Sequence, residues 1–581
     1  MCATGRQWHA REAIRYVPPM SELPDSAGRI HTWLGSLVIV VACFVVYSPS
    51  LGGGFVWDDD THLLLNPVFQ EDGLRRVWFE PPQEINYWPV TFTTYWLEYQ
   101  LWEFDPLGYR VVNILLHALA AIVLWAVLRA LQIPFSWWIA FVFAIHPVNV
   151  ESVAWIAQRK NILSMLFSLI AALLFLRFEA TKKASTYVSS VVSFLIAMLS
   201  KGAAAPFPAA LLLLAWWRRR VITRRDVLLS LPFFLVTIAT SLLEISTQIL
   251  VADDVVVRDD SFMSRLAGAG WVVWFYLGKV LWPANLTFVY PRWEIDATSA
   301  LSWVPLLAGA LLLATAWRAR SGWGRPVWVA LTFYILMLSP VLGFFNIYYM
   351  RFSFVADHYQ YIAMIGIVTL VVGGVGDALR KAPGLPKFVA PLLGATLIAF
   401  FGANTMALSA SYESAEILWL ETLEKNPDAF LAHYNLAQQL HDEDRLEEAA
   451  LHYREALRVQ PRHAESMNNL GKLLQDQGKS AQAIREYQRA IETSPSYLDP
   501  QNNLAILFQQ DGRTDEARAQ FQRALETAPD SGVVHFNFSR FLDQTGDPRS
   551  ALSHYRQAAA LMPRDPRIQT ALREAIRRGE K

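Results

Sequence analysis

The stretch AFLAHYNLAQQLHDEDRLEEAALHYREALRVQPR, residues 429–462, decides the fold of the end of this 581-residue chain, because its pattern returns three more times. Prolines mark a constant step of 34 residues: Pro427, Pro461, Pro495, Pro529 and Pro563. The other landmarks with this step are Asn435, Asn469, Asn503 and Asn537; Ala449, Ala483, Ala517 and Ala551; Tyr453, Tyr487, Phe521 and Tyr555; and Ala456, Ala490, Ala524 and Ala558. Self-similarity at a fixed period predicts a stacked solenoid.

Each repeat has the pattern of a helix-turn-helix unit. Small residues stand where the two helices would cross, an aromatic residue follows four positions later, and a proline ends the second helix. This pattern resembles the tetratricopeptide repeat (TPR). By this resemblance residues 413–564 hold four full repeats, over 429–562, after a half repeat that contains Ala415 and Trp419. Residues 565–581 are predicted to form a capping helix and tail.

The concave face of such an array binds extended polypeptide. The four asparagines of the repeats, Asn435, Asn469, Asn503 and Asn537, share one position in the first helix, and we expect them to form a ladder of amides in this groove. An Asn amide donates and accepts at once, so it can pair with the backbone of an acceptor polypeptide. The alternative is that asparagine is simply frequent at this position in repeats with other ligands.

The first 410 residues have a different composition from the repeats. Residues 411–581 hold 21 Lys/Arg and 26 Asp/Glu, whereas residues 1–410 hold only 30 and 25. This contrast predicts a lipid environment for the first part and water for the second. The formal net charge of zero argues against a nucleic-acid partner, and two cysteines supply no disulfide framework or metal cluster.

A helix needs about 20 apolar residues to cross a membrane. Eleven uncharged runs of suitable length lie between residues 32 and 412: 32–57, 111–128, 130–150, 161–176, 184–200, 202–217, 227–243, 297–317, 326–350, 358–376 and 388–412. We therefore predict an all-α protein in which a polytopic membrane domain, 32–412, follows a cytoplasmic segment, 1–31. A cleaved signal peptide is a poor reading of the first run, because no small-residue cleavage site follows it.

The apolar segment 266–278 is short, because Lys279 interrupts it, and we interpret it as an interfacial or re-entrant element. The loops on the N-terminal side then hold 19 Lys/Arg and the opposite loops hold 11. The inner clusters are Arg218, Arg219, Arg220, Arg224 and Arg225; Arg318, Arg320 and Arg325; and Arg380, Lys381 and Lys387. The positive-inside rule then places the N-terminus in the cytoplasm and the repeats outside. A twelfth span over 266–283 would place the last two clusters outside.

The first outer loop, 52–110, begins GGGFVWDDDTHLLLNP, residues 52–67. Asp58, Asp59 and Asp60 stand where the first predicted span meets water. A carboxylate at such a boundary loses solvation, its pKa rises, and it becomes a competent general base. The alternative is a solvated run that merely ends a helix. Asp60 is also a candidate ligand for a divalent metal.

A set of basic residues falls on the same predicted face: His146, Arg159, Lys160, Arg351 and His358. Acidic and basic groups at one membrane face suit a lipid-phosphate substrate, because cations hold the phosphate leaving group while a carboxylate activates the acceptor. The simpler reading is that the two arginines and the lysine anchor the chain at the membrane interface.

Motifs across nearly the whole chain resemble the transmembrane and TPR-containing protein O-mannosyltransferases. They are Phe55-Val-Trp-Asp58-Asp59, Asn66-Pro67, Tyr87-Trp88-Pro89-Val90, Asn113 with His117, His146-Pro-Val-Asn-Val-Glu151-Ser-Val-Ala-Trp155 with Arg159-Lys160, Trp282-Pro283 and Ala356-Asp357-His358-Tyr359-Gln360-Tyr361. The order of parts, a polytopic half followed by repeats, is similar too.

The resemblance implies the C-type glycosyltransferase (GT-C) fold, Asp58 and Asp59 as the catalytic pair, and a polyprenyl-phosphate sugar as donor, with mannose as the default. The chain departs from the family pattern at several positions, which suggests a bacterial branch and leaves the sugar open. The departures are Trp88 in place of Arg, Arg110 in place of His, Gly202 in place of Glu after Ser200-Lys201, and His358 in place of Arg.

The sequence therefore predicts an integral glycosyltransferase of a bacterial inner membrane. It would move a sugar from a lipid phosphate to Ser or Thr hydroxyls outside, with the repeats presenting the acceptor polypeptide. The alternative is a non-enzymatic, membrane-anchored scaffold that assembles extracytoplasmic complexes, although an anchor needs one helix rather than eleven. A transporter is disfavoured, because coupled transport usually needs an ionisable group within the membrane and the runs contain no acidic residue, arginine or lysine.

Overall fold

The computed structural model of the chain describes residues 26–69, 73–80, 87–249, 258–382, 386 and 388–579. Most of the predicted cytoplasmic segment 1–31 lies outside the described residues, as do Lys387 and the last two residues of the predicted tail. Within the described ranges the regular elements are all helical, which confirms the all-α prediction. The chain divides into two compact units: residues 1–288 with 292–415, and residues 289–291 with 416–581.

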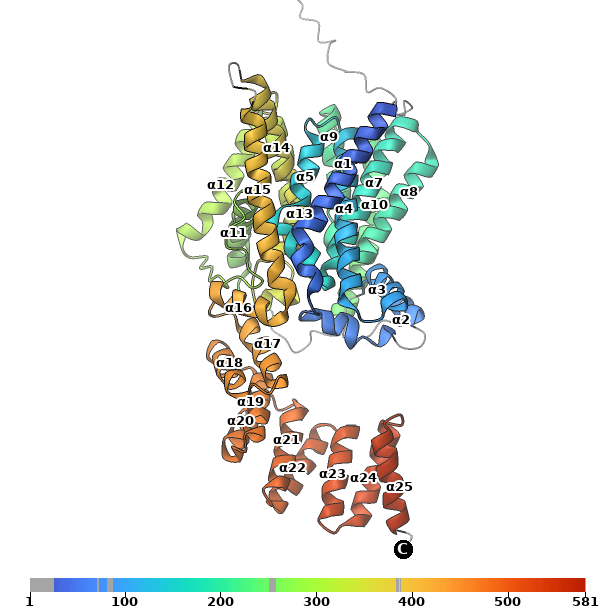
Figure 1. Ribbon diagram of the computed structural model, residues 1–581, viewed down its shortest axis with the longest axis vertical. Coiled ribbons are helices and arrows are strands. Elements are labelled where there is room, and N and C mark those ends of the chain that lie inside the picture. The colour runs from blue at the N-terminus through green and yellow to red at the C-terminus, as the bar shows by residue number, and fades with distance from the viewer. Residues whose placement is uncertain are drawn as a thin grey trace, which may run out of the picture. The chain divides into compact units, whose positions relative to one another are not determined.

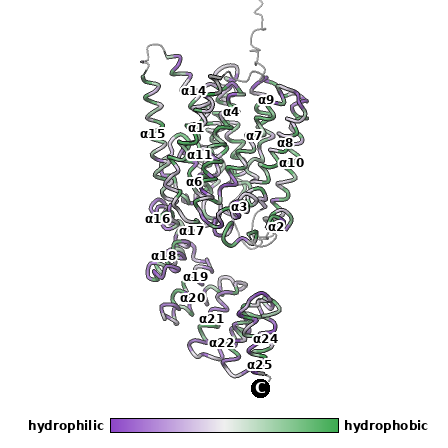
Figure 2. Tube along the Cα trace, turned by 45° about the vertical axis from the view of Figure 1, so that its right-hand side comes forward, coloured by the Kyte–Doolittle hydropathy of each residue, from purple (hydrophilic) through white to green (hydrophobic). Residues whose placement is uncertain are grey.

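Unit 1 is a bundle of helices, most of which run along a common direction (Figure 1). Its helices are α1 (Ser26–Tyr47), α2 (Gly73–Phe79), α3 (Pro89–Trp102), α4 (Pro106–Ala130), α5 (Ser136–Ala144), α6 (Val150–Ala154), α7 (Arg159–Thr181), α8 (Ala184–Ser200), α9 (Phe207–Arg219), α10 (Arg224–Ile249), α11 (Phe262–Leu281), α12 (Ala300–Arg318), α13 (Gly324–Leu338), α14 (Met364–Lys381) and α15 (Val389–Ala410). Apolar residues dominate these helices (Figure 2). Large apolar side chains such as Trp33, Leu235 and Leu301 are exposed, as expected for a surface that faces lipid.

Among the described residues, seven helices are long and apolar enough to cross a membrane, and the bent pair Ser136–Ala144 and Pro147–Ala154 would make an eighth span. The other predicted runs lie in shorter or more polar helices. The run 184–200 forms the 17-residue α8, and 202–217 yields only the 13-residue α9, because the chain leaves helical geometry between Lys201 and Pro206. The run 358–376 begins in a short turn that precedes α14.

The ambiguous segment 266–278 lies inside α11, a continuous helix of 20 residues. The cations Arg265 and Lys279 do not end the helix, because each reaches an oxygen beyond it: Arg265 donates to the Asn346 side chain, and Lys279 donates to two backbone carbonyls. The helix packs closely on α12, since a Cβ at Gly270 would lie 2.5 Å from the backbone of Leu306. The helix is therefore longer than the apolar segment 266–278.

The basic clusters of unit 1 gather at one end of the bundle. Arg218 and Arg219, at the end of α9, pair with Glu179 near the end of α7. Arg325 stacks on Trp217, which brings the cluster 318–325 to the same place. Because α7 has 23 residues, its two ends are about 34 Å apart. The opposite end of α7 begins at Arg159, next to the acidic loop.

Unit 2 is built from helix pairs. Its helices are α16 (Ala415–Lys425), α17 (Phe430–Asp442), α18 (Leu446–Val459), α19 (Ala464–Asp476), α20 (Ser480–Thr493), α21 (Leu498–Gln510), α22 (Thr514–Thr527), α23 (Gly532–Gln544), α24 (Pro548–Leu561) and α25 (Pro566–Gly579). The alanines and aromatic residues of the period are buried where the helices of each pair meet. A Cβ at Gly471 would lie 2.8 Å from the Tyr487 ring, which shows how closely such helices approach.

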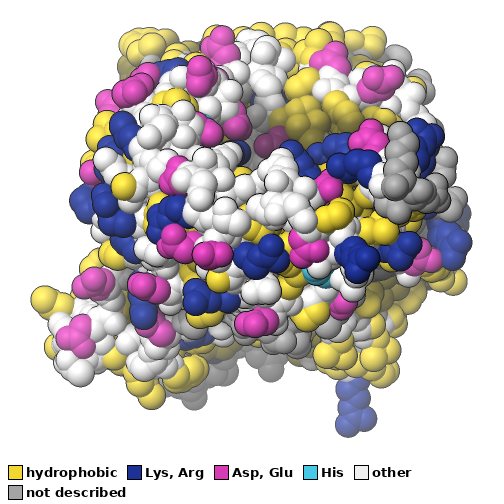
Figure 3. All heavy atoms as spheres, turned by 90° about the horizontal axis from the view of Figure 1, so that it is seen from below, with side chains coloured by type: hydrophobic (Ala, Val, Ile, Leu, Met, Phe, Trp, Pro, Cys, Tyr) yellow, Lys and Arg dark blue, Asp and Glu magenta, His cyan; other side chains and the backbone are white. Residues whose placement is uncertain are grey.

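The exposed side chains include both charge signs. Figure 3 shows acidic and basic side chains interspersed on the face that it presents.

Helix α25 packs on α24 through the buried Ile568, as a cap would.

Candidate functional site

The acidic loop is held in an unusual backbone conformation immediately before Asp58. Trp57 has a φ of 47°, in the left-handed region that a bulky residue rarely adopts. Its indole stacks on Trp155 with the ring centroids 5.6 Å apart, and it also contacts Phe288, Tyr349 and Phe352. Backbone strain of this kind persists only where packing determines it, and it tends to occur at functional sites.

Asp59 is fully buried and anchors the loop. Its Oδ1 accepts a hydrogen bond of 2.7 Å from the Ala157 amide, and its Oδ2 accepts one of 3.0 Å from the Val56 amide. The Arg110 guanidinium lies within electrostatic reach. Burial nevertheless raises the pKa of Asp59 to about 7, outweighing the amides and the arginine.

Asp58 has different surroundings. Its side chain is half-buried, and no group in the described part of the chain donates a hydrogen bond to its carboxylate. Burial raises its pKa, while the positive charge of Lys160 opposes this increase. The carbonyl of Asp58 accepts a 2.7 Å hydrogen bond from Nδ1 of the buried His62, which fixes the backbone and leaves the carboxylate available.

Asp60 is exposed at the start of a π-helical turn, Asp60–Leu64. Among the described residues, no group of three or more His, Cys, Asp or Glu side chains is placed to hold a metal ion. The described residues therefore supply no further metal ligands beside Asp60.

Lys160 faces the two aspartates from the first turn of α7. Its Nζ lies 4.2 Å from the centroid of the Trp88 ring, which is a cation–π contact. Trp88 and Phe92 in turn stack on His62. The ammonium group lies within electrostatic reach of both Asp58 and Asp59.

Two ionisable residues that the sequence did not single out complete this group. Lys201 follows α8, and its Nζ donates a 2.8 Å hydrogen bond to Oδ1 of Asn161. Burial and the nearby Lys160 lower the pKa of Lys201 to about 7. Glu244, on α10, accepts a 3.1 Å hydrogen bond from Nε1 of Trp88. The available signal was its position directly after the uncharged run 227–243, since an acidic residue within an apolar helix suggests a functional site.

The predicted phosphate ligand Arg159 is fully buried and already engaged. Its guanidinium donates to Oδ1 of Asn113 at 2.7 Å and to the Tyr109 carbonyl at 2.8 Å, and it forms an ion pair with Glu98. Its position therefore ties α7 to α3 and α4.

The two predicted histidines also have protein partners. Nδ1 of His146 accepts from the Val148 amide, and its Nε2 donates to the Val280 carbonyl at 3.0 Å, so neither ring nitrogen is left for a ligand. Nδ1 of His358 pairs with Glu151 at 2.7 Å, and the His358 amide donates to the same carboxylate at 2.8 Å.

Arg351 is partly exposed. Its guanidinium donates a 2.9 Å hydrogen bond to the Tyr348 hydroxyl and lies over the rings of Tyr348 and Phe352. Phe352 in turn contacts Trp57, the residue before Asp58. The structure thus brings Lys160 to the aspartates and places Arg351 at the edge of the site.

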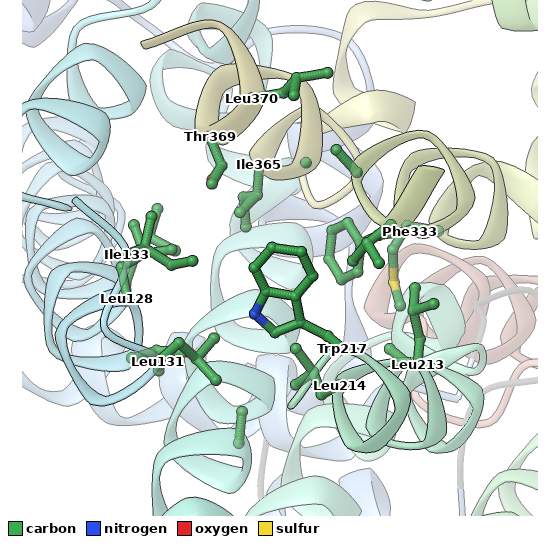
Figure 4. A pocket seen from close by; sticks show the side chains of 18 of the residues that line it. Leu128, Leu131, Ile133, Leu213, Leu214, Trp217, Phe333, Ile365, Thr369 and Leu370 are labelled. Carbon is green, nitrogen blue, oxygen red and sulfur yellow. The ribbon is translucent and has the colours of Figure 1, made fainter. Parts of the chain in front are cut away.

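An apolar cavity of about 390 Å³ lies within the bundle between α4, α7, α9, α13 and α14. The side chains of Leu128, Leu214, Phe333 and Ile365 surround it, and the indole of Trp217 lies among them (Figure 4). Its lining includes Met165 and Ala204, a few residues beyond Lys160 and Lys201. Trp217 lies at the basic end of the bundle, so the cavity extends along the bundle.

The end of unit 1 lies beside the acidic loop. The Tyr412 carbonyl accepts a 3.2 Å hydrogen bond from Nη2 of Arg110, which also donates to the Gly54 carbonyl. A Cβ at Gly53 would lie 2.2 Å from the Tyr412 oxygen. The last residues of unit 1 therefore lie at the same end of unit 1 as the aspartates.

Three of the four repeat asparagines bridge consecutive repeats, and we call the row of four the asparagine ladder, although its members bond to neighbouring residues rather than to one another. Each of three amides donates to a side chain 35 positions earlier, in the preceding repeat: Asn469 to Tyr434 at 3.3 Å, Asn503 to Asn468 at 3.0 Å, and Asn537 to Asn502 at 3.0 Å. Asn435, in the first repeat, donates to the Leu431 carbonyl. The four side chains are partly buried, and each uses one donor in these bonds.

Comparisons with known proteins agree with this division of the chain. The tetratricopeptide repeat family matches residues 409–464, 452–485 and 496–564. The Protein O-mannosyl-transferase F38B6.6 of Caenorhabditis elegans is 34% identical over 171 residues, 27% of this chain and 25% of that protein. The Protein O-mannosyl-transferase TMTC4 of Homo sapiens is 24% identical over 517 residues, 76% of this chain and 67% of that protein.

A solved structure of MamA protein is 17% identical to this chain, with a TM-score of 0.24, over 26% of this chain and 81% of its own. The chain spans only about a quarter of the length of the worm relative. The C-terminal region thus consists of tetratricopeptide repeats, and the chain is similar, at low identity, to protein O-mannosyl-transferases.

Proposed function

We propose that this chain is an integral membrane glycosyltransferase that moves a sugar from a polyprenyl phosphate to Ser or Thr hydroxyls of proteins. The observation that carries the proposal is the available carboxylate of Asp58, paired electrostatically with Lys160 at one end of an apolar bundle. The similarity to protein O-mannosyl-transferases supports the reaction class and makes mannose the default sugar.

In this proposal Asp58 is the general base. It takes the proton from the acceptor hydroxyl, whose oxygen forms a bond to the anomeric carbon of the sugar. The bond from that carbon to the phosphate oxygen breaks, and its electron pair leaves on the lipid phosphate. One base suffices for this inverting displacement, because the phosphate leaves without strong help from an acid. Asp59 keeps the loop in place through its two amide hydrogen bonds.

The phosphate of the donor would meet Lys160 and Lys201. Their ammonium groups lie near one another, and a phosphate between them offsets their mutual repulsion while they stabilise its developing charge. Arg351 would flank this site from its edge. Arg159, His146 and His358 would act through the backbone and side chains that they hold.

The polyprenyl tail would occupy the apolar cavity. Two residues that line the cavity, Met165 on α7 and Ala204 before α9, follow Lys160 and Lys201 closely in the sequence. A lipid in this cavity would place its phosphate toward the lysines and its tail toward Trp217. In this mechanism the two lysines neutralise the phosphate.

The repeats would deliver the acceptor polypeptide. In the asparagine ladder each amide keeps one hydrogen for an extended chain, and the amide oxygens of Asn435, Asn503 and Asn537 can accept from it, whereas the Asn469 oxygen already accepts from Asn468. The path of the chain from Tyr412 supports an arrangement in which the repeats share the compartment of Asp58. With the basic clusters in the cytoplasm, this compartment is the periplasm of a bacterial inner membrane.

The test is a transfer assay with several donors. Membranes that contain the chain are incubated with polyprenyl phosphates carrying radiolabelled mannose, glucose or N-acetylglucosamine, and membranes without the chain are the control. We expect one label to enter protein at Ser or Thr. If none does so while the repeats are folded, the non-enzymatic scaffold becomes the better account.

A further inference from the structure

Glu244 is an acidic side chain on an apolar helix. Helix α10 has the length and composition of a membrane span over Arg224–Ser246. Burying a carboxylate in such a helix is costly, and such residues commonly have a functional partner. The Glu244 carboxylate accepts the indole N–H of Trp88 at 3.1 Å and lies within electrostatic reach of Lys160 and Lys201.

The neighbouring backbone leaves room for this carboxylate. A Cβ at Gly202 would lie 2.4 Å from Oε2 of Glu244, well inside van der Waals contact. Gly202 directly follows Lys201, so the absence of a side chain there lets a carboxylate from α10 approach the lysine. Any side chain at residue 202 would compete with Glu244 for the same space.

Glu244 also connects to the reacting group through Trp88. Its hydrogen bond fixes the edge of the indole, and Lys160 lies 4.2 Å from the centroid of the same ring. Lys160 in turn faces Asp58. One carboxylate thus orients the ring that positions the first lysine and, through its charge, acts on the second.

We propose that Glu244 is a positioning residue of the donor site, whose carboxylate fixes Trp88 and holds the ammonium groups of Lys160 and Lys201 where they meet the phosphate of a lipid-linked substrate. This inference rests on the proposed function of the site. The negative charge of the carboxylate offsets part of the repulsion between the two ammonium groups. Without it, one of the two lysines loses its proton more readily.

The test is binding of a 55-carbon polyprenyl monophosphate, without sugar, to the purified full chain in detergent. Glu244→Gln removes the charge but keeps an oxygen that can accept from Trp88. We expect its affinity at pH 7.5 to fall about tenfold, and the pH at which binding is lost to move down by about one unit. The charged groups that face Lys201 besides Glu244 are Lys160 and Glu151, and both remain in this variant.

The matched control is Glu179→Gln. Glu179 also faces two cations, Arg218 and Arg219, but it does so at the other end of α7. We expect this variant to bind the polyprenyl phosphate as the wild type does. Equal losses in both variants would overturn the proposal, because they would reflect a general effect of removing a buried charge.

A second variant supplies the carboxylate from residue 202 instead of residue 244. In an aspartate the carboxylate oxygens lie about 2.4 Å from the Cβ atom, given C–C and C–O bonds of about 1.5 and 1.25 Å. Because Oε2 of Glu244 lies 2.4 Å from the Cβ position of residue 202, Gly202→Asp combined with Glu244→Ala can return an oxygen to the same point. We expect this double variant to recover most of the affinity that Glu244→Ala loses.

The outcomes separate the two proposals. A wild-type chain that does not bind the polyprenyl phosphate overturns the proposed function, and this inference with it. A wild type that binds, with Glu244→Gln equal to it, overturns only the role of Glu244. If the single variants fail to fold, a folded double variant that binds supports the role, and a folded one that does not bind contradicts it.

Discussion

Oδ1 of Asp59 accepts a hydrogen bond of 2.7 Å from the backbone amide of Ala157, which lies 98 positions further along the chain. Asp58, the preceding residue, receives no such bond to its carboxylate from the described residues and faces Lys160 instead. Two adjacent carboxylates therefore have different surroundings: one joins two segments of unit 1, and the other is available to a substrate. Replacing each should have different consequences.

The stability of unit 1 should depend on pH through Asp59. Its pKa in the folded chain is about 7, above the ordinary value of 3.8, so the folded state holds this proton more tightly than the unfolded state. The stabilisation is fully present below about pH 4 and is lost as the pH rises through 7. We expect the wild-type melting temperature to fall over this range more than that of Asp59→Asn, in thermal unfolding scans of the purified chain. Parallel pH profiles of the two proteins would contradict the prediction.

Gly53→Ala should destabilise the acidic loop. The new methyl group would lie 2.2 Å from the Tyr412 carbonyl and 2.3 Å from Nη1 of Arg110, and the carbonyl cannot move without shifting the chain. Overpacking of this kind costs about 1–3 kcal/mol, which a lower melting temperature would report. Gly52→Ala is the control, because a Cβ there has no neighbour within 4 Å. Equal melting temperatures for the two variants would show that the loop does not pack as described.

Replacing Asn435, Asn469, Asn503 and Asn537 by Ala should weaken glycosylation of long polypeptides far more than that of a short acceptor peptide. Three of these amides bridge repeats, so the solenoid should also lose on the order of 1 kcal/mol of stability for each. Gln475→Ala with Gln509→Ala is the control, because these side chains also bridge repeats by hydrogen bonds but lie outside the ladder. Equal losses for long and short acceptors would reject the peptide-clamp role.

An alkaline phosphatase fused after residue 581 should be active, because the basic clusters of unit 1 gather at the end opposite the acidic loop. A fluorescent protein that folds only in the cytoplasm is the complementary reporter at the same position. An inactive phosphatase with a bright cytoplasmic reporter would separate the repeats from the compartment of Asp58, and would mean that α11 crosses the membrane as an additional span.

The sequence predicted the repeats well, because a strict period of 34 residues leaves few alternatives for the packing of helices. It also singled out the acidic loop and Lys160, which the structure places within electrostatic reach of each other. It did not separate Lys160 from Arg159, because the partners that bury Arg159 are Glu98, Asn113 and a backbone carbonyl from distant segments. Such contacts depend on tertiary structure that local patterns do not report.

The contacts of Glu244 explain two of the positions at which the chain departs from the pattern of the protein O-mannosyltransferases that it resembles. Trp88 and Gly202 are 114 positions apart in the sequence, yet both contact the carboxylate of Glu244. The helical runs were less well predicted, because an uncharged run shows where a helix can cross but not where Gly and Pro end it, as they do around α9.

The central claim is that Asp58 is the base of a sugar transfer, and single-turnover transfer by Asp58→Asn tests it most directly. The substitution keeps the volume of the side chain and removes its basicity, so the rate from a saturating radiolabelled polyprenyl-phosphate sugar should fall about a hundredfold or more. The melting temperature should change little, because the carboxylate holds no other part of the protein in place, and the saturating donor keeps any change in lipid affinity from affecting the rate. A near wild-type rate in Asp58→Asn, with Asp59 intact or also replaced by Asn, would contradict the account.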